Sequence, residues 1–266
     1  MSLIVSLRIP DGLVIAADSL ATMQSQIQVA ASVASQCPKC NQPIELKDLN
    51  LPPIPVASST RSFSQKLISF QRRYGVGTTG MGAVNNRTIY HHVKSIEHRH
   101  DKEFNGLDDV GSLFAEYFHA ELKKQISNLD QAPENYAPLG LQVVGYDGDE
   151  AKTLKVDIGK NVKSTPYTGI GCTVSGDTKL VTQLWSLAKE DPRQQAVFQN
   201  FSLQDAMDYA EFLIKTTAAY QRFANLLPSV GGDIDIALIT PYKDFTWIQS
   251  KRLTRILEPQ DSHSNQ

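Results

Sequence analysis

Two short motifs in this chain carry residue types that commonly bind ligands. Cys37-Pro-Lys-Cys40 has the spacing of one half of a zinc site. No second cysteine or histidine pair has ligand spacing, and the histidines between residues 91 and 100 fall in a charged segment typical of a solvated helix face. We therefore predict no metal, and keep Cys37 and Cys40 as the only candidate ligands for a structural zinc ion.

The second motif is rich in glycine. Gly75-Val-Gly-Thr-Thr-Gly80 fits G-x-G-x-x-G, which marks a dinucleotide-binding turn when a buried strand precedes it and a helix follows. The residues before it, Ser69–Arg73, are too polar for the first strand of a parallel sheet. Strands and helices also do not alternate around it. We therefore predict no cofactor, and since Gly-x-Ser-x-Gly is absent from the sequence, an α/β-hydrolase triad is unsupported.

The composition is that of an ordinary globular protein. Its 266 residues can bury a good core in one domain, or at most two. A net charge of −2 gives no electrostatic reason to expect nucleic acid or an anionic membrane as a partner. No run approaches the roughly 18 consecutive apolar residues of a spanning helix. Three cysteines without a secretory leader fit a reducing compartment, so we expect a cytoplasmic protein.

The strands and helices that must position any reactive side chains begin at the first residues of the chain. Every second residue from Leu3 to Ile9 is apolar, which predicts a strand. Pro10-Asp11-Gly12 supplies a tight turn into a second, almost wholly apolar strand, Leu13–Ala17. Chain ends are usually loose, so an end tied into a sheet indicates that the end itself has a function.

The rest of the chain is organised in blocks. Segment 20–62 is rich in Ser, Gln, Ala and Pro, which predicts an inserted loop, and the polar tail 258–266 is expected to be flexible. Periodicity predicts regular structure at 63–70, strands at 73–78, 139–145, 152–157, 233–240 and 245–250, and helices at 84–98, 107–129, 177–188 and 202–224. This order predicts a single α+β domain over 1–257, with helices outside antiparallel sheets.

The order of several motifs resembles one known family. Gly12-Leu-Val-Ile-Ala-Ala-Asp18-Ser, Lys66-Leu-Ile, Gly77-Thr-Thr-Gly-Met-Gly82 and Ser229-Val-Gly-Gly follow one another as in proteasome β-subunits, nearest to the bacterial branch. These proteins are N-terminal-nucleophile (Ntn) hydrolases. The resemblance covers most of the chain outside the insertion and the tail. It implies a four-layer αββα sandwich, two antiparallel sheets flanked by helices, and assembly into homo-oligomeric rings or spirals.

The resemblance implies that Ser2 is the nucleophile. Mature members of the family begin with a nucleophilic residue whose own α-amine is the general base, and Ser2 would take that position once Met1 is removed. A hydroxyl needs an adjacent base at neutral pH. An α-amine, with a pKa of about 7.7 to 8.0, suits that task. The implied activity is a threonine/serine-type endopeptidase acting on peptides or unfolded proteins, with an ATPase unfoldase as a candidate partner.

The same resemblance implies the residues that would support Ser2. Lys66 would lie beside it and keep the amine neutral by like-charge repulsion. Asp18 would orient Lys66 and keep it protonated. Gly80 would present its backbone N–H to the developing oxyanion, where one donor is commonly worth about 3 kcal/mol.

Further positions match the family less directly. The resemblance implies that Ser175 supports the terminal amine, that Thr22 and Gly82 pair their main chain with an extended substrate, and that Thr78 shapes the specificity pocket. Two departures stand out. Serine replaces the usual threonine nucleophile, and the family's Asp before its late Ser-Gly-Gly is unmatched, because residues 225–228 are Asn-Leu-Leu-Pro.

Two alternatives stay open. If Met1 is retained, Ser2 has no free amine, and the chain would be a catalytically silent ring subunit that assembles or gates without hydrolysis. The other alternative is an Ntn amidase that acts on small amides instead of peptides.

Overall fold

The computed structural model describes residues 2–27, 39–40, 54–100, 104–224 and 226–251. The chain divides into two compact units, Thr22–Thr60 and the remainder. The smaller unit contains β3 (Ala21–Ile27) and β4 (Ile54–Arg61), which form a two-stranded sheet. Part of the segment for which the sequence predicts a loop is therefore strand. The tail 258–266 lies outside the described residues.

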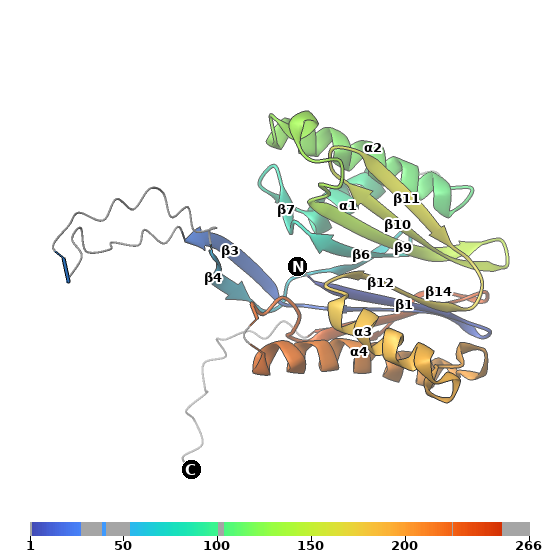
Figure 1. Cartoon of the computed structure of the whole chain (residues 1–266). Helices are drawn as coiled ribbons and strands as arrows, with labels where there is room; N and C mark the ends of the chain where they lie inside the picture. The colour runs from blue at the N-terminus through green and yellow to red at the C-terminus, as the bar shows by residue number, and fades with distance from the viewer. Residues whose placement is uncertain (1, 28–38, 41–53, 101–103, 225, 252–266) are drawn as a thin grey trace, which may run out of the picture. The chain divides into compact units, whose positions relative to one another are not determined.

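Two five-stranded antiparallel sheets form the larger unit (Figure 1). The first has the order β12-β1-β2-β13-β14, and the second β11-β10-β9-β6-β5. The strands are β1 (Leu3–Ile9), β2 (Gly12–Asp18), β5 (Leu67–Phe70), β6 (Tyr74–Gly80), β9 (Leu139–Asp147), β10 (Glu150–Ile158), β11 (Val162–Tyr167), β12 (Gly171–Gly176), β13 (Ile234–Thr240) and β14 (Lys243–Gln249). A small hairpin, β7 (Ala83–Val84) and β8 (Arg87–Thr88), follows the second sheet's β6.

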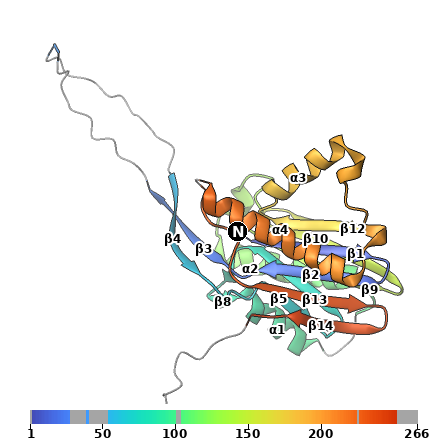
Figure 2. The same ribbon diagram turned by 90° about the horizontal axis from the view of Figure 1, so that it is seen from below.

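The described residues include four helices, which flank these sheets. Helices α1 (Ile89–Arg99) and α2 (Leu107–Gln125) pack on the second sheet, and α4 (Leu203–Phe223) packs on β1 and β2 of the first. Helix α3 (Lys179–Glu190) lies beside α4. Figure 1 shows α1 and α2 on one side of the paired sheets and α3 and α4 on the other, and Figure 2, seen from below, shows α4 in front of the strands. The described part of the unit also contains short 3-10 turns at Leu129–Gln131, Pro192–Gln194 and Phe198–Asn200.

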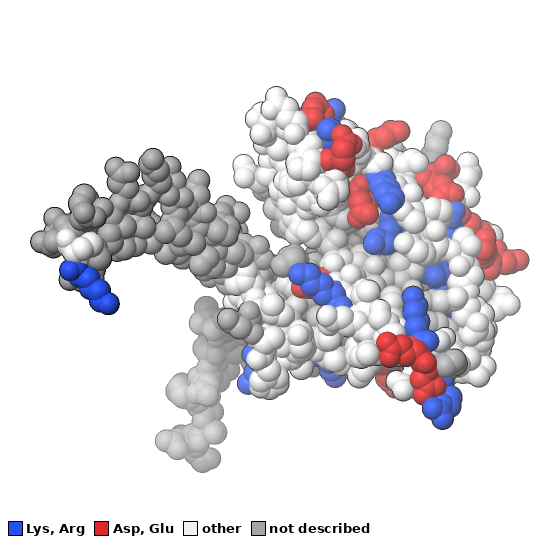
Figure 3. Space-filling view, in the orientation of Figure 1, with Lys and Arg blue, Asp and Glu red and all other residues white. Residues whose placement is uncertain are grey.

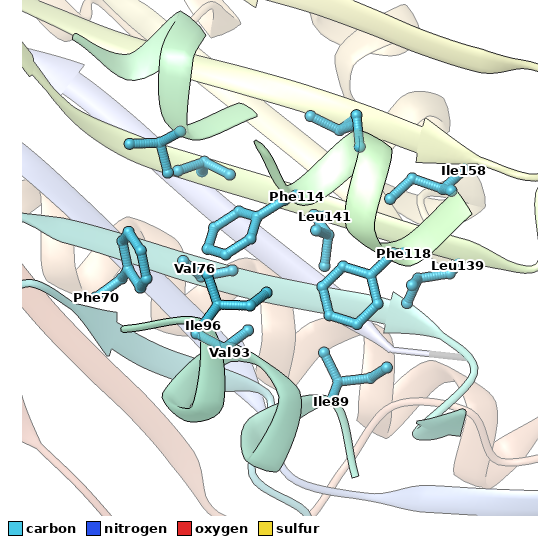
Figure 4. Packing of buried hydrophobic residues seen from close by; sticks show 14 of the residues in the cluster. Phe70, Val76, Ile89, Val93, Ile96, Phe114, Phe118, Leu139, Leu141 and Ile158 are labelled. Carbon is cyan, nitrogen blue, oxygen red and sulfur yellow. The ribbon is translucent and has the colours of Figure 1, made fainter. Parts of the chain in front are cut away.

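Three apolar clusters hold this unit together. The first joins α1 and α2 to the second sheet around three rings, Phe70, Phe114 and Phe118 (Figure 4). The second joins α3 and α4 to the first sheet. The third contains residues of both sheets, including Ile4 and Val144, and so forms their common interface. Burial of one such side chain contributes about 1.5 to 3 kcal/mol.

The strand predicted at the start of the chain lies inside its sheet. All residues of β1 and β2 are buried, and β1 pairs with β12 on one side and β2 on the other. Even the polar residues of β1 are satisfied internally. Arg8 donates to the Gly169 carbonyl at 2.8 Å and to the hydroxyls of Thr153 and Thr173 at 2.9 and 2.8 Å. Burying a polar strand residue is tolerable only with such partners.

The glycines of the G-x-G-x-x-G motif serve sheet packing. The whole motif lies in β6, between antiparallel neighbours β5 and β9. A Cβ at Gly77 would come within 2.5 Å of the Ile4 side chain, so glycine there lets the two sheets approach. The next element is the β7–β8 hairpin, so the strand–turn–helix context of a dinucleotide site is not present.

Several boundaries differ from the sequence prediction. Helix α1 begins at Ile89 and not at 84, because Asn85 and Asn86, with φ of 48° and 61°, turn the β7–β8 hairpin. Helix α2 ends at Gln125, before the short turn that contains Leu129. Strand β11 was not predicted, since its mostly exposed residues include proline and lysine, as is usual at a sheet edge.

The distribution of charged side chains on the surface agrees with the net charge of −2. In Figure 3, acidic and basic side chains are interspersed over the visible face of the larger unit, without one sign dominating it.

Candidate active site

Asp18, the last residue of β2, is the centre of a buried polar cluster. Its carboxylate is fully buried and accepts main-chain hydrogen bonds from Leu3 at 3.0 Å, Gly231 at 3.0 Å and Leu20 at 3.3 Å. Both carboxylate oxygens also accept from Lys66 Nζ at 2.9 Å. A buried carboxylate requires this density of donors, so Asp18 ties the start of β1 to a loop from the far end of the chain.

Lys66 lies just before β5 and is only 6% exposed. Besides Asp18, its ammonium donates to the Leu20 carbonyl. Burial lowers the pKa of Lys66 below that of a free lysine, and the Asp18 carboxylate opposes that shift. Burial correspondingly raises the pKa of Asp18, against the effect of Lys66 and the backbone donors. Burial thus disfavours the charged form of each group, and the ion pair between them opposes that effect.

Ser2 is linked to the main chain of Lys66 through Thr78. The Ser2 hydroxyl donates to the Thr78 carbonyl at 3.3 Å, and the Thr78 N–H donates to the Lys66 carbonyl at 2.8 Å. The main-chain N–H of Leu3, the residue after Ser2, donates to the Asp18 carboxylate, as described above. Together with the peptide bond from Ser2 to Leu3, these hydrogen bonds connect Ser2, Thr78, Lys66 and Asp18 in one closed circuit, which reaches Lys66 at its carbonyl and Asp18 at its carboxylate. The structure brings together these four residues, which the sequence resemblance placed in one site.

The main chain of Ser2 is fixed from the other side by the end of β12. The Asp177 N–H donates to the Ser2 carbonyl at 2.7 Å. At Gly176, φ is 95°, and a Cβ there would lie 1.9 Å from the same carbonyl oxygen. Only glycine fits this approach.

Asp177 is itself held by residues that sequence reasoning missed. Its Oδ2 accepts from the Ser229 hydroxyl at 2.7 Å and from Gln221 Nε2 at 3.0 Å. Gln221 Oε1 in turn accepts the N–H groups of Ser229 and Val230, at 2.9 and 3.0 Å. The Asp177 carboxylate thus contacts Ser229 of the late Ser-Val-Gly-Gly motif, although residues 225–228 lack the acidic residue expected before it. A glutamine within a helical pattern gave no signal of this role.

Ser175 has a different environment from the one expected. It lies opposite Ile4 in the β1–β12 pairing, and its hydroxyl donates to Gln142 Oε1 at 2.6 Å. Gln142 Nε2 donates onward to the Ser6 hydroxyl at 2.7 Å. Support of the Ser2 amine by Ser175 therefore stays a prediction, and its described hydrogen bond links the two sheets.

The remaining predicted site residues are placed as follows. Gly80 ends β6 with φ of 81°, and a Cβ there would lie 2.1 Å from the Pro138 carbonyl oxygen. Gly82 is exposed, with open space where its Cβ would be. Thr78 is buried next to Ser2. Thr22 belongs to the smaller unit, so its pairing with a substrate stays a prediction.

The described residues show no group of three or more potential metal ligands. Of the two candidate zinc ligands, Cys40 is free and exposed, and Cys37 lies outside the described residues. The expectation of a solvated histidine face is wrong for His92. That ring is buried, and its two nitrogens lie 2.8 Å from the Tyr117 hydroxyl and 2.9 Å from the Val84 carbonyl.

Comparison with known proteins bears on the fold. No protein-family model matches the chain, and no curated protein does. Among solved structures, the Anbu (Gly-1) mutant from Hyphomicrobium sp. strain MC1 matches with a TM-score of 0.56 and 13% sequence identity, over 92% of this chain and 85% of that chain. Anbu is a bacterial proteasome-like protein with the Ntn-hydrolase fold, and this likeness supports the same broad fold here.

None of the helices that the structure describes is both long and apolar enough to cross a membrane.

Proposed function

We propose that this chain is a proteasome-like peptidase that hydrolyses peptide bonds with Ser2, after removal of Met1 exposes its α-amine. The observation that carries the proposal is the closed circuit of Ser2, Thr78, Lys66 and Asp18. We interpret the two sheets and their flanking helices as the four-layer αββα sandwich of Ntn hydrolases.

The first chemical step would be attack by Ser2. Its Oγ forms a bond to the substrate carbonyl carbon while its own α-amine takes the hydroxyl proton. The cation of Lys66 favours the neutral amine and so keeps the base available at neutral pH. The amine then gives the proton to the leaving nitrogen, the C–N bond breaks, and an ester on Ser2 results.

The second step would be hydrolysis of that ester. The same amine removes a proton from water, the water oxygen attacks the ester carbonyl, and the proton returns to Oγ as the acid leaves. Gly80 would donate its N–H to the oxyanion in both steps. Extended substrates would pair with the main chain at Gly82 and at Thr22, and Thr78 would shape the specificity pocket.

The surroundings of Ser2 support this assignment of roles. Asp177, Ser229 and Gln221 hold the Ser2 carbonyl through one backbone hydrogen bond, and the Ser2 hydroxyl donates to the Thr78 carbonyl, so the main chain and the side chain of Ser2 are both held in place. Fixing a nucleophile and its base in this way removes the entropic cost of bringing them together. We propose Asp177 as a positioning residue that sequence reasoning did not identify.

The proposal includes an assembly and a location. We propose that copies of this chain form a homo-oligomeric ring or spiral in the cytoplasm, which would enclose Ser2 and admit peptides or unfolded chains. An ATPase unfoldase would be the partner that supplies such chains.

One observation favours a second candidate, a catalytically silent ring subunit. Ser2 is only 3% exposed, and its hydroxyl donates to a main-chain carbonyl. A nucleophile must be reachable, so the silent subunit would keep Ser2 as a structural residue and retain Met1. An amidase acting on small amides would share the Ser2 mechanism and differ only in substrate.

Intact mass and covalent labelling of the full chain test the proposal. We expect a mass lower by one methionine residue, and labelling by a peptide epoxyketone, which reacts with the hydroxyl and the amine of one N-terminal residue. Ser2→Ala should abolish the label, while the matched control Ser186→Ala, on the exposed side of α3, should retain it. Retained Met1 together with absence of labelling would establish the silent subunit instead. A panel of fluorogenic peptides and small amides then separates peptidase from amidase.

A further inference from the structure

A polar hollow lies between α1, α2 and the β7–β8 hairpin, and the proposed reaction does not use it. Its volume is about 540 Å³, within the range of small-molecule sites, which is about 300 to 1,000 Å³. None of its lining residues belongs to the circuit around Ser2. The β7 label in Figure 1 marks the end of the α1–α2 layer where the hairpin lies.

Positive charge exceeds negative charge in this hollow. Arg87, Arg99 and Lys124 line it, together with one carboxylate, Glu121. Glu121 is already bound on both oxygens, since Lys124 donates to Oε1 at 2.5 Å and Asn85 Nδ2 to Oε2 at 2.7 Å. The Glu121 carboxylate therefore neutralises Lys124, and the guanidinium groups of Arg87 and Arg99 carry the remaining positive charge of the hollow. In the part of the chain that the structure describes, neither Arg87 nor Arg99 has a salt-bridge partner.

The walls of the hollow are held in place by internal hydrogen bonds. The buried His92 lies within hydrogen-bond distance of both the Val84 carbonyl and the Tyr117 hydroxyl. Arg99 stacks over the Tyr117 ring, 5.6 Å from its centroid, and its Nε donates to the Ser95 carbonyl at 3.1 Å. The terminal N–H groups of Arg99 therefore keep a defined direction without engaging a carboxylate.

The hairpin that carries Arg87 is also fixed. Asn85 has a left-handed backbone, and its N–H donates to Gln125 Oε1 at 2.7 Å, while its side chain donates to both the carbonyl and the carboxylate of Glu121. A non-glycine residue in this conformation is uncommon and is maintained only by surrounding contacts. The position of Arg87 relative to α2 is thus fixed by a turn that is anchored to α2 through Asn85.

We propose that this hollow binds a small molecule that carries a phosphate or carboxylate group, with Arg87 and Arg99 as its ligands. The planar guanidinium offers paired N–H donors that match the oxygens of either anion. A guanidinium that is already held in position loses less side-chain entropy on binding than a freely rotating one. Arg99 is therefore expected to contribute more to binding than Arg87. The volume leaves room for more than the anionic group itself, so the ligand is expected to have a polar organic body.

Calorimetric titration of the full chain tests this site, with inorganic phosphate and citrate as separate probes at matched ionic strength. Arg87→Gln and Arg99→Gln should each weaken binding at least about tenfold. Arg222→Gln removes an exposed arginine from α4 and should leave binding unchanged. Binding of only one probe identifies the anion that the site prefers and supports the proposal.

The proposal is overturned if neither probe binds more tightly than sodium chloride, or if the double variant Arg87→Gln/Arg99→Gln binds as well as the unmodified chain. Both arginines are exposed, so circular dichroism should report unchanged folding in these variants. Ser2→Ala should bind phosphate and citrate normally, because this site does not depend on the proposed peptidase.

Discussion

Lys66→Met should reveal the energetic role of the buried pair with Asp18. The substitution keeps the apolar stem of Lys66 and removes its charge, so the fully buried Asp18 carboxylate loses its only described salt-bridge partner. Leaving one member of a buried pair uncompensated costs about 3 to 5 kcal/mol. Three main-chain N–H groups still donate to Asp18, so we expect the lower end, about 3 kcal/mol. A chain of this size should then melt about 6 to 12 °C lower.

The pH dependence of this loss gives a sharper test. Burial already raises the pKa of Asp18, and the substitution removes Lys66, the cation that opposes that shift. A folded-state pKa above the unfolded value means that the folded chain binds the extra proton, so stability is gained as pH falls through the folded pKa. The difference in the free energy of unfolding between Lys66→Met and the unmodified chain should therefore be smaller at pH 5 than at pH 7.

Guanidinium denaturation followed by circular dichroism at both pH values measures this. The double variant Asp18→Asn/Lys66→Met, which buries no charge, should be more stable than Lys66→Met at pH 7, and its difference from the unmodified chain should not be smaller at pH 5. Lys215→Met removes a mostly exposed lysine paired with Glu211 on α4 and should change stability by less than about 1 kcal/mol. A Lys66→Met chain as stable as the Lys215→Met control at pH 7 would refute the reasoning.

Three further outcomes are expected. Burial raises the pKa of the Cys172 thiol to about 12, so at pH 8 iodoacetamide should modify it about a thousandfold more slowly than the exposed Cys40, as peptide mass mapping would report. Gly176→Ala should displace the Ser2 carbonyl, lowering both thermal stability and epoxyketone labelling; unchanged labelling would contradict the described contact. Ser202→Ala removes the capping box at the start of α4 and should lower the free energy of unfolding by about 1 kcal/mol, measured by chemical denaturation.

Local sequence signals predicted some elements well. Alternating apolar residues and a Pro-Asp-Gly turn correctly predicted the β1–β2 hairpin, and Ser202 correctly predicted the start of α4. Both signals depend on residues that are adjacent in the chain. The start of α1 was misplaced, since Asn85 and Asn86 turn a hairpin inside a segment with helical periodicity. Strand β11 gave too weak an apolar signal to be recognised.

The candidate site was only partly accessible from the sequence. The contact between Asp18 and Lys66 depends on the packing of two different sheets, which no local pattern encodes, and the family resemblance alone suggested it. Asp177 was interpreted as the start of a helix, which in the structure begins two residues later, at Lys179. Its contact with Gln221 joins residues that are 44 positions apart. Such a partner can be identified only once the fold is known.

The place of β2 in its sheet has a consequence for biosynthesis. One of its neighbours, β1, is made at once, but the other, β13, pairs Ile234 with Asp18 and is synthesised more than 200 residues later. Until then the apolar strand β2 has one edge without a hydrogen-bonded neighbour while the chain is still on the ribosome, and Asp18 lacks the hydrogen bond from the Gly231 N–H. Pairings of such long sequence separation form slowly. The nascent chain is thus expected to depend on a chaperone until its last two strands emerge, and to aggregate when released early.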